Sequence, residues 1–122
     1  WNVAFERSVI GELAEHLPDR REALQSIQER LVDLMPVFQK WYLHPDCSGS
    51  ASIKVVGKAV LGEAASYGNL PVAAGDEAYL AWHRLVFEKN ADAKTAEHLE
   101  AYCAQDTVLP LKLIDELRKL QQ

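Results

Sequence analysis

A tyrosine and an aspartate one helical turn apart are the residues of this sequence best placed to do chemistry. The segment EAYCAQDTVLPLKLIDELRKL, residues 100–120, has a helical pattern, and Tyr102 and Asp106 fall on its apolar stripe. The other members of that stripe are Leu99, Leu109, Leu113 and Leu117. A carboxylate that faces a core needs a cation, a hydrogen-bonding partner or a metal. From the residues alone, Asp106 could be a metal ligand, an interhelical partner of a Lys, Arg or Ser, or the N-cap of a new helix over 107–120.

Composition limits the classes of protein to which the chain can belong. Its 122 residues, 48% of them hydrophobic, suffice for one core and predict a single domain or part of one. A net charge of −5 argues against a free-standing, non-specific nucleic-acid binder, but a nuclease would carry acidic metal ligands of its own. No apolar run is long enough to span a membrane, and no secretory leader is visible. Cys47 and Cys103 fit no disulfide framework, so we expect a cytoplasmic protein.

Hydrophobic periodicity predicts a mainly α chain of about five to six helices, with at most one or two short strands. The expected helices cover residues 5–17, 19–31, 53–64, 77–89 and 93–120. Their expected N-caps are Asp19, Ser52 and Asp76. Pro110 should kink the last helix or split it in two, because proline donates no hydrogen bond and clashes with the preceding turn.

The connecting segments are less regular. RLVDLMP, residues 30–36, could be a brief buried strand or the end of the second helix, and Pro36 should end it. Residues 40–52 and 66–75 have the composition of loops, and NADA, residues 90–93, that of a short turn.

Two stretches resemble motifs of a nuclease family. YCAQD, residues 102–106, is Tyr-x-x-x-Asp on a helix, and WNVAFE, residues 1–6, is Asn-x-x-Phe-acid at an expected strand-to-helix junction. Together they resemble the third and second motifs of the tyrosine-bearing DEDD (DnaQ-like) 3′–5′ exonucleases, which have an α/β ribonuclease-H-like fold. RLVDL, residues 30–34, is similar to a short edge strand of that fold, and SIKVVGKAV, residues 52–60, to the Ser-Leu-Lys helix that follows it.

A closer resemblance covers nearly the whole chain. WYLHPDCSGSASIKVV, a later Gly-Asp-Glu-Ala and AYCAQDTVLPL resemble an uncharacterised bacterial domain that usually follows a RecB-like nuclease module. That family carries YNxxFE, HPxxxGSxSIK and YCxxDT in the same order. The chain would then be the C-terminal, helical portion of a ribonuclease-H-like nuclease domain. The first exonuclease motif, Asp-x-Glu, is expected upstream of residue 1, and the acid of the second motif is Glu6, where most exonucleases have Asp.

The resemblance implies a two-ion site for Mg²⁺ or Mn²⁺, completed by residues outside this chain, that hydrolyses phosphodiesters of DNA or RNA. Asp106 and Glu6 would hold metal, and Tyr102 would orient the attacking water. Asn2 would touch the terminal nucleotide or hold its loop, and Lys54 would pair with a phosphate. The intact parent would bind nucleic acid, whereas this chain alone would be inactive.

The competing interpretation is a non-catalytic helical interaction or scaffold domain. Glu6 would then be an acid favoured by the helix dipole, Tyr102 a core aromatic and Lys54 a solvated residue. Structural roles are also expected for several other residues: His44 as a loop residue, Trp82 and His83 on a core-facing helix, Cys103 as a buried thiol, and Asp33.

Overall fold

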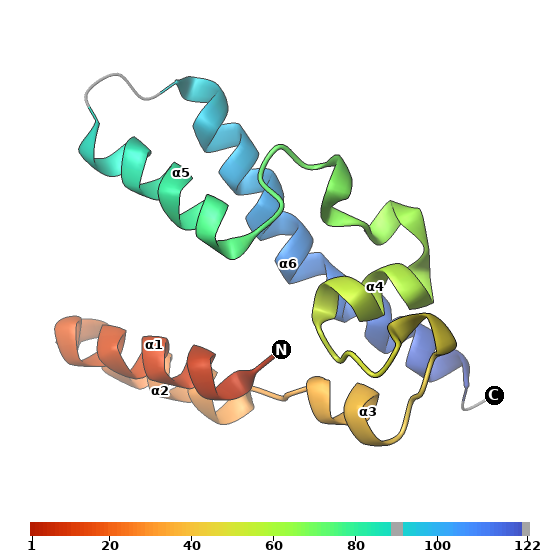
Figure 1. The fold of residues 1–122 in the computed structure, drawn as a ribbon. Coiled ribbons are helices and arrows are strands. Elements are labelled where there is room, and N and C mark those ends of the chain that lie inside the picture. Colours follow the sequence, from red (N-terminus) through yellow and green to blue (C-terminus); the bar gives the residue numbers. More distant parts are fainter. Residues whose placement is uncertain (89–91, 121–122) are drawn as a thin grey trace. The chain divides into compact units, whose positions relative to one another are not determined.

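The structure is a computed structural model that describes residues 1–88 and 92–120 (Figure 1). Within these ranges the chain forms six α-helices and four short 3₁₀-helices, with no strand, so the predicted mainly α class is confirmed. The chain divides into two compact units, residues 1–43 and residues 44–122. Each unit is described by itself below. No helix in the described ranges is long and apolar enough to cross a membrane.

The first unit is built on two helices that pack against each other. Helix α1 spans Val3–His16 and α2 spans Arg21–Arg30, joined by the 3₁₀-helix η1, Pro18–Arg20. The side-chain amide of Gln28 donates to the carbonyl oxygen of Arg7 at 2.6 Å and ties the two helices together. The prediction that Asp19 caps the second helix is wrong, because Asp19 lies inside η1. The N-cap residue of α2 is Arg20, whose side chain makes no capping hydrogen bond.

Asp33 organises the rest of the first unit. Its carboxylate accepts hydrogen bonds from the main-chain N–H groups of Asn2 (3.2 Å) and Val3 (3.1 Å), at the start of α1. It also accepts from the N–H of Met35 (2.9 Å), the first residue of α3, Met35–Lys40. The unpaired N–H groups at two helix starts therefore share one acceptor. The segment 30–36 contains no strand, and Pro36 lies in the first turn of α3 instead of ending a segment, because proline fits the first turn of a helix.

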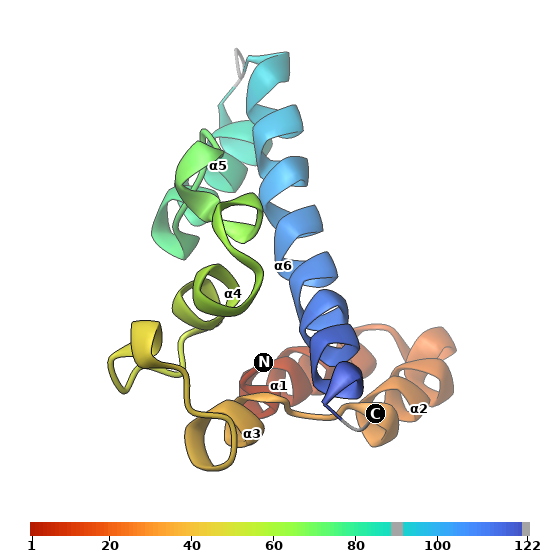
Figure 2. The ribbon, with the colours of Figure 1, turned by 90° about the vertical axis from the view of Figure 1, so that its right-hand side faces the viewer.

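The second unit is arranged along its longest helix. Helix α6, Ala93–Lys119, packs against α4, Ile53–Leu61, and against α5, Gly75–Phe87 (Figures 1 and 2). Three 3₁₀-helices complete the unit: η2, Pro45–Cys47; η3, Glu63–Ala65; and η4, Tyr67–Asn69. The last two lie in the stretch that the sequence assigned to the end of a helix and to a loop.

The apolar stripe of α6 forms the core of this unit. Leu109 and Leu113 are 1% and 0% exposed, and the other stripe residues are half-buried, as predicted. Helix α4 approaches the stripe closely at Gly57, where an added Cβ would lie 2.7 Å from Cδ2 of Leu109. Glycine at this position therefore permits the contact between α4 and α6.

Pro110 does not split α6. The helix runs without interruption from Ala93 to Lys119, so Asp106 lies inside it and is not the N-cap of a new helix. Proline donates no main-chain hydrogen bond, and the helical acceptor it leaves without a donor is the carbonyl four residues earlier, which belongs to Asp106. The prediction of a split is wrong: Leu109 and Leu113, on either side of the proline, are buried, and tertiary packing of this kind stabilises the helix across it.

The start and the outer face of α5 also differ from expectation. Asp76 is not the cap; Glu77 accepts from the N–H groups of Ala73 (2.8 Å) and Ala74 (3.2 Å). Ser52 does occupy the N-cap position of α4, but without a side-chain hydrogen bond to the helix.

Trp82 is 45% exposed and His83 is exposed as well, so this face of α5 does not point to the core, contrary to the prediction. Of the expected turn at 90–93, residues 90 and 91 lie outside the described ranges.

Candidate functional site

Asp106 is held by a tyrosine hydroxyl. The Oη of Tyr67, in η4, donates a hydrogen bond to Oδ1 of Asp106 at 2.5 Å. Tyr67 is 4% exposed, whereas Asp106 is half-buried, so the bond lies at the margin of the core. No ion pair involves Asp106 within the described residues. The carboxylate on the apolar stripe thus accepts from a neutral donor, Tyr67, and a second phenol, Tyr102, interacts with it as well; a carboxylate still has lone pairs for a further partner.

Lys54 reaches the same cluster from α4. Its ammonium group donates to the carbonyl oxygen of Ala73 at 2.5 Å. The same group lies over two aromatic rings, 5.0 Å from the centroid of Tyr67 and 5.6 Å from that of Tyr102. Both separations are within the range of cation–π attraction. The two rings pack edge to face, with centroids 5.9 Å apart. One cation, two phenols and one carboxylate therefore form a contiguous set, which we call the tyrosine–aspartate cluster: Lys54, Tyr67, Tyr102 and Asp106.

The electrostatics of the cluster keep both phenols protonated. Burial raises the pKa of Tyr67 far above its ordinary value, and the hydrogen bond to Asp106 and its negative charge raise that pKa further. The pKa of Tyr102 is raised mainly by burial and then by the charge of Asp106. Both hydroxyls are therefore neutral hydrogen-bond donors at neutral pH.

Main-chain and amide contacts fix the segment that carries Tyr67. The side-chain amide of Gln105, next to Asp106 on α6, donates to the carbonyl oxygen of Ala65 at 3.0 Å. Ser66 accepts a hydrogen bond from the N–H of Gly68 at 3.2 Å and so shapes the turn into η4. Anchors on both sides of the tyrosine hold its hydroxyl opposite the carboxylate.

Three of the five predicted site residues, Lys54, Tyr102 and Asp106, meet in this cluster. The other two lie in the first unit. Asn2 precedes α1 with a left-handed backbone (φ 59°, ψ 59°), and its side chain does not cap the helix. Glu6 is exposed in the first turn of α1. Because the structure describes each unit by itself, the proximity of Glu6 to Asp106 stays a prediction.

A metal ion would find an incomplete set of ligands in the described residues. Within residues 1–88 and 92–120, no three His, Cys, Asp or Glu side chains gather closely enough to hold one. Asp106 itself suits a hard cation, since a carboxylate that gives one lone pair to Tyr67 still has oxygen lone pairs to offer. The carboxylate of Asp106 is therefore chemically suited to be one ligand of a two-ion site.

The sequence analysis missed Tyr67. It lies in a stretch rich in Ser, Gly and Asn, SYGNLPVAAG, whose composition is typical of a loop. The available signal was the requirement of Asp106 for a donor, together with a tyrosine in a connecting segment. The prediction that Cys103 is buried is wrong, because its side chain is exposed. His44 lies in a loop as predicted, where its Nδ1 accepts from the N–H of Asp46 at 3.3 Å.

Comparison with known proteins gives one partial match. Residues 1–52 match a family model described as "Domain of unknown function (DUF2779)". No curated protein and no solved structure matches the chain. The match covers the first unit and the segment up to the start of α4, and all four residues of the tyrosine–aspartate cluster lie outside it.

Proposed function

We propose that this chain is the C-terminal portion of a metal-dependent nuclease domain that removes nucleotides from the 3′ end of DNA or RNA. The single observation that supports the proposal most is the meeting of Lys54, Tyr102 and Asp106. The resemblance to the exonucleases singled out these three residues from two separate segments, and α4 and α6 carry them to one cluster. A chance Tyr-x-x-x-Asp would not require a lysine from another helix.

In this proposal each residue of the chain has a defined task. Mg²⁺ or Mn²⁺, when bound, neutralises the charge that develops on the attacking and leaving oxygens. Asp106 supplies one metal-facing carboxylate, and Tyr67 fixes its orientation. Tyr102, whose pKa is raised, remains a phenol and donates a hydrogen bond that orients the attacking water without removing its proton.

The remaining proposed partners come from outside the cluster. Glu6 completes the metal ligands together with an Asp-x-Glu expected upstream, Asn2 contacts the terminal nucleotide, and Lys54 faces a phosphate. The parent protein would be cytoplasmic and bacterial, with the ribonuclease-H-like first half directly before this chain and a RecB-like nuclease module upstream of that half. In isolation the 122-residue chain would hydrolyse nothing, because part of the ligand set is absent.

A non-catalytic scaffold is the second candidate. The observation that favours it is the bond between Tyr67 and Asp106, which satisfies the carboxylate without any metal. In that case Lys54, Tyr67, Tyr102 and Asp106 would stabilise the packing of α4 on α6, and the parent would show no hydrolysis attributable to this domain.

The test is an activity assay on the intact parent carrying Asp106→Asn. We expect the variant to lose 3′–5′ exonuclease activity in Mg²⁺ or Mn²⁺ while its melting temperature without metal stays near that of the wild type, since the amide oxygen can still accept from Tyr67. Asp115→Asn is the matched control, because Asp115 lies on the same helix in an exposed ion pair with Arg118 at 3.0 Å. Full activity of Asp106→Asn would refute the assignment and favour the scaffold.

A second measurement tests the proposed metal site separately. In an experimental structure of the parent, the carboxylates of Glu6 and Asp106 should lie within roughly 10 Å of each other, as a shared two-ion site requires. Carboxylates on opposite faces of the fold would contradict the proposal. So would robust Mg²⁺-dependent digestion by the 122-residue chain alone, because its active residues would then have to be others.

A further inference from the structure

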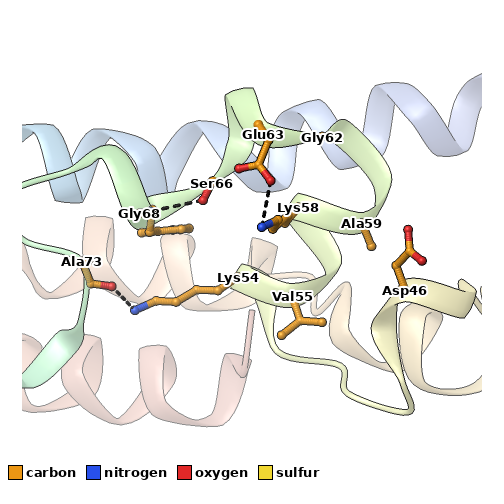
Figure 3. Close-up of a pocket in the computed structure, with 11 residues that line it drawn as sticks. Asp46, Lys54, Val55, Lys58, Ala59, Gly62, Glu63, Ser66, Gly68 and Ala73 are labelled. Carbon is orange, nitrogen blue, oxygen red and sulfur yellow. Dashed lines mark hydrogen bonds and ion pairs between the residues drawn. The ribbon is translucent and has the colours of Figure 1, made fainter.

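A pocket in the second unit is lined in part by Tyr67. It has a volume of about 690 Å³, within the range of roughly 300–1,000 Å³ typical of small-molecule sites. Its walls are α4, the turn before α4 and the segment 62–73 (Figure 3). Tyr67 lines it, whereas Tyr102 and Asp106 are not among its lining residues. The pocket therefore shares Lys54 and Tyr67 with the tyrosine–aspartate cluster but does not include Tyr102 or Asp106.

Two ammonium groups enter this pocket from one face of α4. Lys54 and Lys58 are four residues apart and extend toward the segment 62–73 (Figure 3). Lys54 gives one hydrogen to Ala73, and Lys58 pairs with Glu63 at 2.8 Å. An ammonium group has three donors, so each lysine keeps two for a ligand.

The ion pair of Lys58 is easily exchanged. The side chains of Lys58 and Glu63 are 57% and 73% exposed, and exposed pairs of this kind contribute little to stability. Ser66 adds a third donor, since its oxygen accepts from Gly68 and its own hydroxyl hydrogen is left to donate. Two cations from α4 and a hydroxyl from the segment 62–73 favour an anion with several acceptor oxygens, such as a phosphate.

The rest of the pocket selects for more than an anion. Two carboxylates, Asp46 and Glu63, also line it, and they would repel a simple polyanion. A ligand that carries N–H donors besides its phosphate would satisfy them. Val55, Ala59 and Ala73 supply small apolar surfaces against which a flat ring can pack. A phosphate, an amino-bearing ring and a size below 690 Å³ together describe one nucleotide.

We propose that this pocket binds a nucleoside monophosphate, with its phosphate on Lys54 and Lys58 and its base toward Asp46. The identity of the ligand rests on the proposed function, because a 3′–5′ exonuclease releases nucleoside monophosphates. Tyr67 gives the pocket a route to the cluster, since it lines the pocket and its hydroxyl holds Asp106. A bound nucleotide that shifts Tyr67 also shifts the aspartate.

The experiment titrates the 122-residue chain with deoxyadenosine monophosphate, without metal, by isothermal calorimetry and by amide chemical shifts. Inorganic phosphate and deoxyadenosine form separate arms. We expect the nucleotide to bind more tightly than either fragment, and Lys58→Gln to weaken it roughly tenfold or more, because one charge-assisted hydrogen bond is lost. Lys119→Gln is the control, since Lys119 also makes an exposed ion pair, with Glu116, away from the pocket.

Several results would overturn the inference. These are no binding at millimolar nucleotide, equal binding of phosphate alone, and binding that Lys58→Gln leaves unchanged. The assay involves no hydrolysis, so it separates the two proposals. If the parent is active but its C-terminal chain does not bind the nucleotide, only the nucleotide-pocket proposal is refuted. If the parent is inactive but the chain binds the nucleotide through Lys58, the nuclease proposal is refuted and the pocket proposal stands.

Discussion

Replacing Tyr67 by phenylalanine removes one hydroxyl and tests what holds Asp106. The phenylalanine ring would keep the edge-to-face contact with Tyr102 and the position beneath the ammonium group of Lys54. The 2.5 Å hydrogen bond to Asp106 would be lost, and a half-buried carboxylate would remain without this donor. The substitution therefore isolates the hydrogen bond from the packing.

The expected cost follows from the charge and burial of the acceptor. A hydrogen bond to a charged group contributes about 1.5–3 kcal/mol net, and the partial exposure of Asp106 lets water replace some of it. We expect Tyr67→Phe to lose about 1–2 kcal/mol of unfolding free energy. For a domain of this size that corresponds to a fall in melting temperature of roughly 4–10 °C, measured by circular dichroism.

The control is Tyr79→Phe, which removes a hydroxyl from a side chain that is 60% exposed on α5. An exposed substitution of this kind should change stability by no more than about 0.5 kcal/mol. If Tyr67→Phe melts at the same temperature as Tyr79→Phe, the hydrogen bond does not secure the aspartate. The account of a satisfied carboxylate on the apolar stripe would then be wrong.

Three more measurements follow from the structure. Because the pKa of Tyr67 is raised on folding, its contribution to stability is complete below the ordinary tyrosine pKa of about 10 and falls at higher pH; pH-dependent unfolding should show this loss in the wild type and less of it in Tyr67→Phe. Gly57→Ala should destabilise by roughly 1 kcal/mol in urea unfolding, since overpacking against Leu109 costs about 1–3 kcal/mol and helix propensity returns about 1. Asp33→Ala should cost roughly 1–3 kcal/mol by the same assay, because two helix starts lose their acceptor, and a variant as stable as the wild type would contradict that role.

Sequence periodicity was enough to predict the helices that carry the candidate site. The stripe from Leu99 to Leu117 is buried or half-buried throughout, and α4, α5 and α6 begin within two residues of the predicted starts. These elements are long and amphipathic, so apolar spacing determines them locally. The meeting of Lys54 with the Tyr-x-x-x-Asp was expected only through the resemblance, since no local rule relates α4 to α6.

Local rules failed where long-range contacts decide. Pro36 was expected to end a segment and Pro110 to kink or split the last helix; Pro36 lies in the first turn of α3, and α6 continues past Pro110. The candidate cap Asp76 was displaced by Glu77, which reaches back to two main-chain N–H groups. Tyr67 was missed because its partner is 39 residues away in the sequence, a distance over which turn composition carries no information.

The hydrogen bond from Tyr67 has a consequence for the evolution of this domain. Because the fold itself satisfies Asp106, a lineage that lost catalysis could retain the aspartate for stability, and the residue would then persist without activity. The two histories leave different substitution patterns. An aspartate kept for the hydrogen bond should be replaced together with Tyr67, whereas one kept for metal should survive the replacement of Tyr67 by phenylalanine. Co-variation of these two positions among homologues would therefore distinguish a lineage with the proposed nuclease activity from one that has lost it.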